Sequence, residues 1–270
     1  MTRALRFEGS FVPATETCRV LVVGASGELG SALARHYARA GARLSLWGRD
    51  NGRLDALARS CLDLGAGALG TRSLDLTDTD AALDALAREE AEEPFSLALF
   101  AAGCGDVRAE GAMVEDAAQV ARLGQVNFVA QAAMAARCAQ AMAARGHGAI
   151  VVIGSAAADH ALPFAAAYAG SKAGLARFTD ALRIGVRPYG VSVTLVSPGF
   201  IDTAAARRVP GPKPLILQPD RAAALIARAA ARRKPHAVLP WPFGLLRLFS
   251  AILPRFLRDR LLRALTPPGV

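Results

Sequence analysis

Short apolar segments alternate with helical patterns along most of the chain. Residues 19–23 form a β-branched run that indicates a buried strand, and residues 43–47 and 149–154 indicate two more. Between the first two strands, residues 31–38 show a helical pattern. This alternation predicts a Rossmann-type α/β fold in a single domain, with a doubly wound parallel sheet between layers of helices.

A glycine-rich turn joins the first predicted strand to the first predicted helix. Gly24, Gly27 and Gly30 lie in the segment Gly-Ala-Ser-Gly-Glu-Leu-Gly. Glycines at this place allow a tight turn and let backbone N–H groups approach a pyrophosphate, which the helix N-terminus then stabilises. The chain is therefore expected to bind a dinucleotide. The intervening residues expected to contact it are Ser26, Glu28 and Leu29.

The end of the second predicted strand bears on which dinucleotide is bound. An acidic residue there would bond the ribose 2′-hydroxyl of NAD, but this chain has Gly48 followed by Arg49. A guanidinium at this position suits the 2′-phosphate of NADP. Asp50 comes next, so the alternative that Arg49 is only a solvated loop charge stays open. The sequence favours NADP(H) over NAD(H).

Tyr168 and Lys172 are the pair most indicative of chemistry. A spacing of four places both side chains on one face of a helix, with the ammonium beside the phenol. A free tyrosine has a pKa of about 10, and a neighbouring cation is expected to lower it. Ser155 directly follows the strand predicted at 149–154. The three residues are expected to form a proton-transfer site.

With these motifs in this order, the chain resembles the short-chain dehydrogenase/reductase family over roughly residues 18–240. The resemblance implies a catalytic set of Asn127, Ser155, Tyr168 and Lys172. In such a set, Ser155 would hold a substrate carbonyl oxygen and Tyr168 would protonate it. Lys172 would bond the nicotinamide ribose, and Asn127 would anchor a water molecule that passes protons to Lys172. Besides Tyr168 and Lys172, the further positions that the resemblance assigns to the cofactor are Asp75, Leu76, Ala102, Gly103, Pro198, Gly199, Ile201 and Thr203.

Three departures from the family pattern keep other functions open. Val23 replaces the usual Thr, the glycine spacing is closer to the extended, epimerase-type branch, and Phe100-Ala101-Ala102-Gly103 replaces Asn-Asn-Ala-Gly. The altered loop is the main support for a non-catalytic NADP-binding sensor or scaffold. The glycine spacing supports an epimerase or dehydratase. Such enzymes usually need a larger C-terminal substrate domain, however, and only about 70 residues follow the segment 197–203, which matches the family segment after the sixth strand. The complete catalytic set favours an active oxidoreductase.

Charge is concentrated near the C-terminus. Residues 201–270 hold 13 Lys and Arg against 3 Asp and Glu, a net charge of +10, whereas residues 1–200 carry a net charge of −1. No nucleic-acid-binding module accompanies this charge, so nucleic acid is not an expected partner. The four cysteines are widely spaced and the histidines lack a metal-ligand spacing, so no metal site is expected either.

The basic residues 241–270 are also apolar and are expected to form a C-terminal extension. Residues 255–265 indicate an amphipathic helix, with Leu257, Leu261, Ala264 and Leu265 on one side. Neither this helix nor the proline-interrupted segment before it supplies the roughly 20 apolar residues needed to span a bilayer. Two hypotheses stay open: residues 241–265 contact an anionic membrane surface, or they pack over the substrate pocket or a second subunit.

The remaining expectations concern substrate and setting. The family resemblance places the substrate-binding loop near residues 200–218. Apolar residues and prolines at 209–217 in this loop suggest an apolar carbonyl or alcohol, such as a fatty aldehyde, a 3-oxoacyl chain or a sterol-like ketone. Residues 1–6 lack the apolar core of a signal peptide, so we expect a short arm at 1–17 before a catalytic domain at 18–240. This predicts a cytoplasmic enzyme, with any lipid contact at the inner membrane surface. The family resemblance also implies a homo-oligomer.

Overall fold

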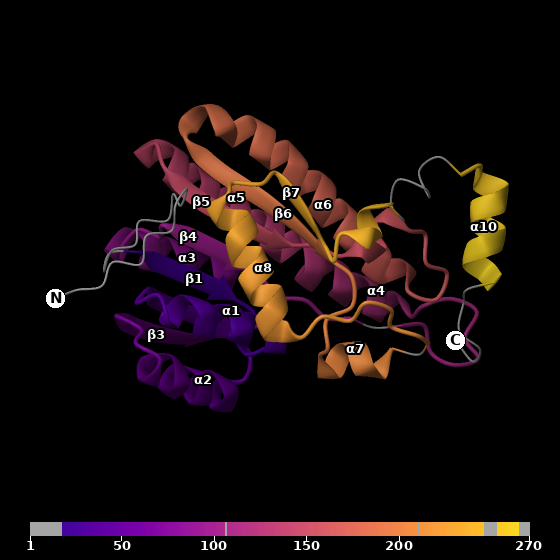
Figure 1. Cartoon of the computed structure of the whole chain (residues 1–270), viewed down its shortest axis with the longest axis horizontal. Helices are drawn as coiled ribbons and strands as arrows, with labels where there is room; N and C mark the ends of the chain where they lie inside the picture. Colours follow the sequence, from indigo (N-terminus) through magenta and orange to yellow (C-terminus); the bar gives the residue numbers. More distant parts are fainter. Residues whose placement is uncertain (1–17, 106, 210, 246–252, 265–270) are drawn as a thin grey trace.

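The computed structural model describes residues 18–105, 107–209, 211–245 and 253–264, so the expected N-terminal arm lies outside the described residues. Within them, seven parallel strands form one sheet in the order β3-β2-β1-β4-β5-β6-β7 (Figure 1). The strands are β1 (Arg19–Val23), β2 (Arg43–Gly48), β3 (Ala68–Ser73), β4 (Leu97–Phe100), β5 (Gly148–Ile153), β6 (Val191–Pro198) and β7 (His236–Leu239). The predicted Rossmann-type parallel sheet is confirmed.

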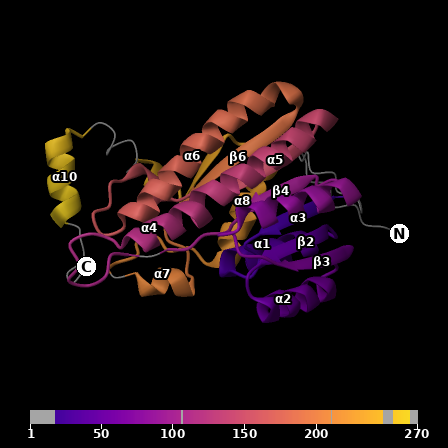
Figure 2. The same cartoon turned by 180° about the vertical axis from the view of Figure 1, so that it is seen from behind.

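Helices cover both faces of the sheet (Figures 1 and 2). One apolar core lies between the sheet and α1 (Glu28–Ala38), α2 (Asn51–Asp63) and α8 (Pro219–Ala231). A second core lies between the sheet and α3 (Thr79–Glu92), α5 (Ala130–Arg145) and α6 (Ala166–Val186). The other α-helices with printed bounds are α4 (Ala117–Gly124), α7 (Ala204–Arg208) and α10 (Arg255–Ala264).

Strand β1 shows why the strand sequences are continuous apolar runs. Val20 and Val22 belong to one core, whereas Leu21 and Val23 belong to the other, and none of the four is more than 1% exposed. A strand that is buried on both faces has no polar side, so its sequence does not alternate. This local signal allowed the strands to be predicted to within a residue at 19–23, 43–47 and 149–154.

The strand order places a crevice beside the glycine-rich turn. The chain leaves β1 to one side to form β2 and β3, and later returns to form β4 on the other side of β1. Val23 and Phe100, at the carboxyl ends of β1 and β4, are partners in the sheet register. Ligands of doubly wound sheets bind at this reversal of strand order, outside the carboxyl ends of the strands. The turn after β1 and the altered loop after β4 therefore face each other there.

A buried carboxylate connects α3 to the sheet. Glu89 accepts hydrogen bonds from the Ser45 hydroxyl at 2.6 Å, and from the Arg19 and Arg72 guanidinium groups at 3.1 and 2.8 Å. The Trp47 indole N–H donates to the Ser45 hydroxyl at 2.9 Å. Buried charges need such partners, because desolvating an unpaired carboxylate is costly. The network fixes the tryptophan at the end of β2.

Several boundaries differ from the sequence expectation. The first helix begins at Glu28 rather than at residue 31, because Gly27 already serves as its N-cap. The expected substrate loop 200–218 contains a short helix, α7, whose N-terminus is capped by the Thr203 hydroxyl at 3.1 Å from the Ala206 N–H. The predicted amphipathic helix is present as α10, although residue 265 and residues 246–252 lie outside the described ranges.

Among the described residues, no helix is long and apolar enough to cross a membrane.

Candidate active site

The glycine-rich turn after β1 is packed too tightly for side chains. Gly24 has a φ of +88°, and a Cβ there would come within 2.5 Å of the Ala102 backbone nitrogen. A Cβ on Gly30 would lie 2.1 Å from the Gly24 carbonyl oxygen. The Gly24 and Ala25 N–H groups both donate to the Trp47 carbonyl at 2.8 Å. The turn is thus held against β2 and the loop after β4, as a close approach of backbone to a phosphate requires.

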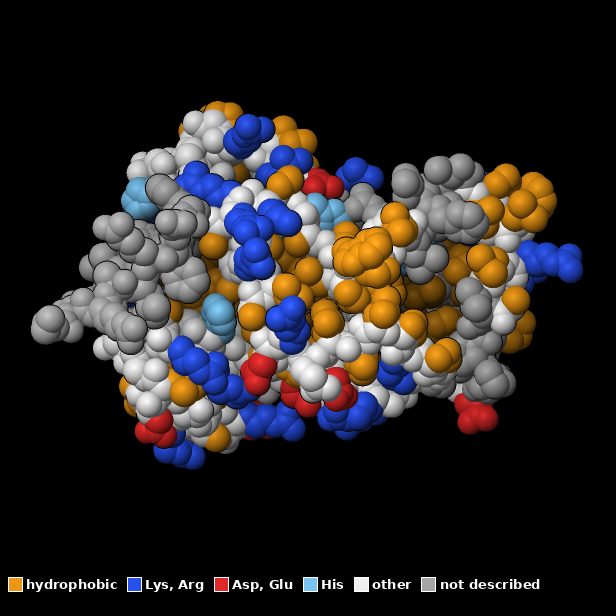
Figure 3. Space-filling model, viewed as in Figure 1, with side chains coloured by type: hydrophobic (Ala, Val, Ile, Leu, Met, Phe, Trp, Pro, Cys, Tyr) orange, Lys and Arg blue, Asp and Glu red, His pale blue; other side chains and the backbone are white. Residues whose placement is uncertain are grey.

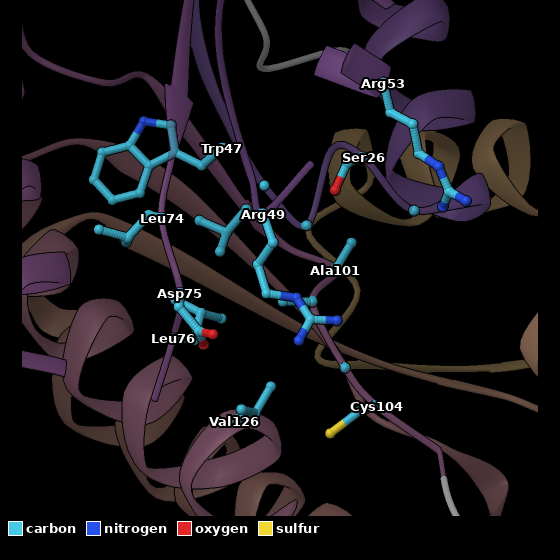
Figure 4. A pocket seen from close by; sticks show the side chains of 16 residues that line it. Ser26, Trp47, Arg49, Arg53, Leu74, Asp75, Leu76, Ala101, Cys104 and Val126 are labelled. Carbon is cyan, nitrogen blue, oxygen red and sulfur yellow. The ribbon is translucent and has the colours of Figure 1, made fainter. Parts of the chain in front are cut away.

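A cavity of about 180 Å³ lies at the carboxyl ends of β1, β2 and β4 (Figure 4). Half of the sixteen residues that line it were predicted as cofactor contacts: Gly24, Ser26, Gly27, Arg49, Asp75, Leu76, Ala102 and Gly103. The other lining residues are Val23, Trp47, Gly48, Arg53, Leu74, Ala101, Cys104 and Val126. The residues present fit a dinucleotide, because small residues and a glycine turn form the bottom of the cavity and two guanidinium groups flank it.

Arg49 and Arg53 border this cavity, and the sequence analysis identified only the first. Figure 4 shows the Arg49 side chain reaching across the cavity toward Asp75 and Cys104, with Arg53 beside Ser26. Asp50 caps α2 by accepting the Arg53 N–H at 3.0 Å, and it pairs with the Arg53 side chain at 3.3 Å. The presence of Asp50 next to Arg49 was the reason to doubt that Arg49 binds a phosphate. In the structure the Asp50 carboxylate is used by the N-terminus of α2 and by Arg53.

Asp75 lies on the opposite side of the cavity from the glycine turn. Its carboxylate accepts the Thr77 N–H at 2.9 Å, and this hydrogen bond holds the pKa of Asp75 below its ordinary value. The nearby Arg49 guanidinium lowers that pKa further. Leu76, the next residue, is 6% exposed and belongs to the second apolar core. An ionised carboxylate is therefore available at a position that the family resemblance assigns to the cofactor.

Ser155, Tyr168 and Lys172 are brought together by β5 and α6. Ser155 follows the end of β5, and its side chain lies close enough to Tyr168 on α6 to act on the pKa of the phenol. Lys172 lies one turn further along α6, is 4% exposed, and donates from Nζ to the Ile153 carbonyl at 2.9 Å. The expected convergence of the three side chains is present.

The expected direction of the tyrosine pKa shift is wrong. Burial raises the pKa of Tyr168, and the Ser155 hydrogen bond opposes this only in part. Burial also lowers the pKa of Lys172 to about 8, because the charged ammonium is removed from water. The sequence analysis expected the Lys172 ammonium to lie beside the Tyr168 phenol and to lower its pKa. In the structure that ammonium donates to a backbone carbonyl, and desolvation outweighs the other contributions.

Asn127 lies in a π-helical turn, η1 (Gln125–Val129), between α4 and α5. The residue is fully buried and bonds the backbone of Cys104 twice, accepting its N–H at 2.8 Å and donating to its carbonyl at 2.9 Å. Asn127 also donates to the Ser171 hydroxyl on α6 at 3.2 Å. Such π-helical turns are frequent at functional sites. This one joins the altered loop after β4 to the helix that carries Tyr168.

The tyrosine and lysine site adjoins the cavity. A Cβ on Gly103 would lie 3.4 Å from both Asn127 Oδ1 and Lys172 Nζ, and Gly103 itself lines the cavity. Cys104, the next lining residue, affects the pKa values of Tyr168 and Lys172 electrostatically. The candidate proton-transfer residues therefore stand at one end of the candidate cofactor cavity.

Other predicted cofactor residues lie outside the cavity lining. Leu29 packs against the core and Gly30 lies beneath Gly24. Pro198 ends β6, Ile201 is 8% exposed, and the Thr203 hydroxyl is used as the helix cap of α7. These residues are placed around the carboxyl edge of the sheet, next to the cavity region and not within it.

Two contacts connect this outer group to neighbouring segments. The Glu28 carboxylate accepts the Ala204 N–H at 2.6 Å and pairs with Arg207 at 3.4 Å, so α1 is tied to α7. Phe243 packs on Gly199, where a Cβ would lie 2.4 Å from the phenyl ring. The glycine after β6 is therefore required by the start of the C-terminal extension. Sequence reasoning had no signal for either contact, because each joins residues far apart in the chain.

Comparison with known proteins agrees with this geometry. The family model for short chain dehydrogenase matches residues 19–212. An uncharacterised oxidoreductase of Mycobacterium tuberculosis is 33% identical over 254 residues, which cover 92% of this chain and 99% of the relative. An uncharacterised oxidoreductase of Myxococcus xanthus is 30% identical over 245 residues, covering 91% of this chain and 96% of the relative.

A solved structure has the same fold. The short-chain dehydrogenase from Sphingobium yanoikuyae, in complex with NADPH, superposes with a TM-score of 0.75 and 26% sequence identity. The match covers 88% of this chain and 97% of that protein. Together with the family match over residues 19–212, these similarities show that the chain belongs to the short-chain dehydrogenase/reductase family.

Proposed function

We propose that the protein is an NADP(H)-dependent oxidoreductase that transfers hydride between a nicotinamide cofactor and an apolar carbonyl or alcohol. The observation that carries this proposal is the joint placement of Ser155, Tyr168 and Lys172 at the Gly103 end of the cavity. Family membership supports an oxidoreductase, and the geometry supports proton transfer at the position where a substrate oxygen would meet a cofactor.

The proposed roles follow from the chemistry of each group. When bound, the nicotinamide cofactor supplies or accepts the hydride. Ser155 holds the substrate oxygen, and the Tyr168 hydroxyl donates a proton to it during reduction. A raised pKa keeps Tyr168 protonated at neutral pH, which suits a proton donor. General acid catalysis of this kind contributes about 10²–10⁴-fold in rate.

Lys172 and Asn127 act on the surroundings of the tyrosine. Lys172 is positioned one helical turn from Tyr168 to bond the nicotinamide ribose, and Asn127 holds the loop that contains Cys104. The water-anchoring role implied by the family resemblance is proposed for Asn127 in addition to its loop contacts. Phe100 and Ala101 stand where the family has asparagines, so this loop lacks their polar groups, and the two bonds from Asn127 to Cys104 fix its backbone instead.

The cofactor preference is proposed from the two arginines at the cavity. Arg49 and Arg53 line it, while the strand end carries Gly48 and no carboxylate. Guanidinium groups bind phosphate through charge-assisted hydrogen bonds, so this arrangement suits the 2′-phosphate of NADP(H). The NADPH complex of the relative from Sphingobium yanoikuyae supports the same preference.

The substrate class is proposed from the apolar character of the segment after β6. Leu215 and Ile216 in this segment are 55% and 40% exposed, and Phe200 makes an edge-to-face contact with Phe243. A fatty aldehyde, a 3-oxoacyl chain or a sterol-like ketone would gain from burial of its apolar surface against such residues.

The test is consumption of NADPH and of NADH with aldehydes and ketones of increasing chain length. Tyr168→Phe removes only the proposed proton donor and should lower kcat by at least 100-fold. Tyr189→Phe is the matched control, because Tyr189 is a solvent-exposed tyrosine (59%) outside the site. Turnover that prefers NADPH, rises with chain length and is lost only in Tyr168→Phe supports the proposal. Equal turnover in both variants would refute it.

A non-catalytic cofactor-binding sensor or scaffold is the second candidate. The observation that favours it is the loop Phe100–Gly103, in which alanine replaces the family's asparagine. NADPH binding by calorimetry without turnover of any carbonyl or alcohol would establish it. An epimerase or dehydratase, suggested by the glycine spacing, would instead release product with no net change in the oxidation state of the cofactor.

We further propose that the protein is a homo-oligomer located in the cytoplasm. The outer face of α5 and α6 supports self-association, because an apolar groove runs along it. Its lining includes Ala133, Ala136, Ala143, Leu182 and Val186. Light scattering coupled to gel filtration would give the mass of the assembly directly.

A further inference from the structure

The apolar stripe of α10 faces outward. Leu257, Leu261 and Ala264 are spaced four and three residues apart and therefore share one face of the helix. Leu257 and Leu261 are 44% and 43% exposed, and Phe256 beside them is 72% exposed. Arg258 and Asp259 form an ion pair at 3.4 Å on the same helix, with side chains 29% and 47% exposed, so the apolar residues are no better covered than the charged ones. Helices of globular proteins normally bury the apolar side, so this arrangement calls for a partner.

A second apolar element lies in the turn that follows β7. Trp241 is 71% exposed and Leu245 is 59% exposed. Figure 3 shows hydrophobic side chains over this turn, right of the middle of the face in view, and over α10 at one end of the molecule. The segment between β4 and α4, with Met113 and Val114 at 90% and 75% exposed, reaches the same end (Figure 1). We call these exposed residues together the apolar patch, and α10 and the turn after β7 supply most of them.

Positive charge borders the patch. The ten residues of α10 contain four arginines and one aspartate, a net charge of +3, and Arg255, Arg260 and Arg263 are exposed. An isologous contact between two copies would place these arginines near one another, which is unfavourable. An anionic lipid surface has complementary charge, and exposed Trp and Phe side chains suit the boundary between headgroups and acyl chains.

We propose that α10 and the turn after β7 form a docking surface for an anionic lipid bilayer. At ten residues the helix is about 15 Å long, so it lies in the headgroup region and does not cross the bilayer. Phe256, Leu257 and Leu261 enter the acyl boundary, while the arginines bind phosphate groups of the lipids.

The docking surface is connected to the candidate active site. Phe243 belongs to the same turn as Trp241, packs on Gly199 and contacts Phe200 with ring centroids 6.3 Å apart. Gly199 and Phe200 directly follow β6 at the carboxyl edge of the sheet, the edge on which the cavity lies further along, beside β1, β2 and β4. Lipid docking through this turn therefore holds the carboxyl edge of the sheet near the bilayer, a source of lipophilic carbonyls; this last step rests on the proposed function.

Sedimentation of the full-length protein with vesicles tests the docking surface without cofactor or substrate. Vesicles of phosphatidylglycerol and phosphatidylcholine in equal amounts are compared with vesicles of phosphatidylcholine alone. We expect binding to the anionic vesicles, weak or no binding to the neutral ones, and release of bound protein at high salt.

Paired variants assign the binding to α10. Arg255→Glu with Arg263→Glu should weaken binding at least tenfold, because each basic residue at an anionic surface contributes about fivefold. Arg59→Glu with Arg88→Glu, on exposed positions of α2 and α3, makes the same charge change elsewhere and should reduce binding much less.

A second pair tests the apolar face. Phe256→Ser with Leu261→Ser should also weaken binding at least tenfold, since each removes an apolar side chain from the acyl boundary. The control is Leu62→Ser with Ile184→Ser, which changes exposed apolar residues (54% and 65%) on α2 and α6. Equal loss in the α10 variants and their controls would overturn the proposal.

Two further results would also overturn it. One is no preference of the wild-type protein for anionic vesicles. The other is a wild-type protein that binds no lipid, together with a double variant, Phe256→Ser with Leu261→Ser, whose assembly has a smaller mass than that of the wild type. That pair of results would show that a second copy of the chain, and not a bilayer, covers α10. Vesicle binding by a protein that shows no turnover would leave the docking surface standing and reject only the proposed function. Vesicle binding together with faster turnover of long-chain aldehydes supports both.

Discussion

Replacement of the buried lysine should make the protein more stable and inactive at the same time. Lys172 is 4% exposed, and burial lowers its pKa from 10.5 to about 8. A lowered pKa in the folded state means that folding disfavours the charged form. Because one pKa unit corresponds to about 1.4 kcal/mol, the charged lysine reduces the free energy of unfolding by about 3 kcal/mol below pH 8.

The variant Lys172→Met isolates this effect, because methionine keeps much of the apolar stem and carries no charge. It also removes the hydrogen bond from Nζ to the Ile153 carbonyl, which costs about 1 kcal/mol. The net expectation at pH 7 is a gain of about 2 kcal/mol in the free energy of unfolding, or roughly 5 °C in Tm for a chain of this size. The gain is largest below pH 8 and disappears as pH rises toward 10.5, where the unfolded lysine also loses its proton.

Urea unfolding of both proteins without cofactor, at pH 7 and at a series of values up to pH 10, measures this difference. Other titrating groups are common to both proteins, so they cancel in the comparison. The stability advantage of Lys172→Met should shrink across that range while its turnover stays below detection throughout. A difference in stability that does not depend on pH, or a variant less stable than wild type at pH 7, would refute the reasoning.

Other residues give sharper tests of cofactor binding and of the fold. Arg49→Ser should raise KM for NADPH by about 10–100-fold, through loss of charge-assisted bonds, and leave KM for NADH nearly unchanged in steady-state assays. Gly30→Ala should lower the free energy of unfolding by about 1–3 kcal/mol, because its Cβ would overlap the Gly24 carbonyl, and should weaken NADPH binding measured by calorimetry. Gly185→Ala, in an open position of α6, should instead raise the free energy of unfolding by up to about 1 kcal/mol, and Tm should rise slightly with it. Glu89→Ala should cost about 3–5 kcal/mol in urea unfolding, because two arginines lose a buried partner, and unchanged stability would argue against the network.

The parts of the site that sequence could predict are those encoded locally. The turn with Gly24, Gly27 and Gly30 is recognisable because the strand before it and the helix after it are its immediate neighbours. Tyr168 and Lys172 share a helix face because four residues separate them, whatever the rest of the chain does. The apolar runs indicated the strands for the same reason.

What sequence could not predict depends on contacts between distant segments. The raised pKa of Tyr168 reflects burial by the packing of the whole site, and no neighbour in the chain signals it. Asn127 bonds the backbone of Cys104 across 23 residues, and Glu89 is joined to Ser45 across 44. Arg53 reaches the cavity only because α2 begins where Asp50 caps it. Each of these features can be predicted only from the folded structure, because a pattern of residue types along the chain does not show which distant residues come into contact.

The two tryptophans of the chain stand in opposite surroundings, which gives the protein two optical signals of its own. Trp47 is 1% exposed and lines the candidate cofactor cavity, whereas Trp241 is 71% exposed on the proposed lipid surface. A buried indole emits at shorter wavelengths than a hydrated one. Energy transfer to a reduced nicotinamide should therefore quench the short-wavelength side of the emission, and contact with lipid should shift the long-wavelength side. One unlabelled protein can thus report occupancy at both places in a single titration.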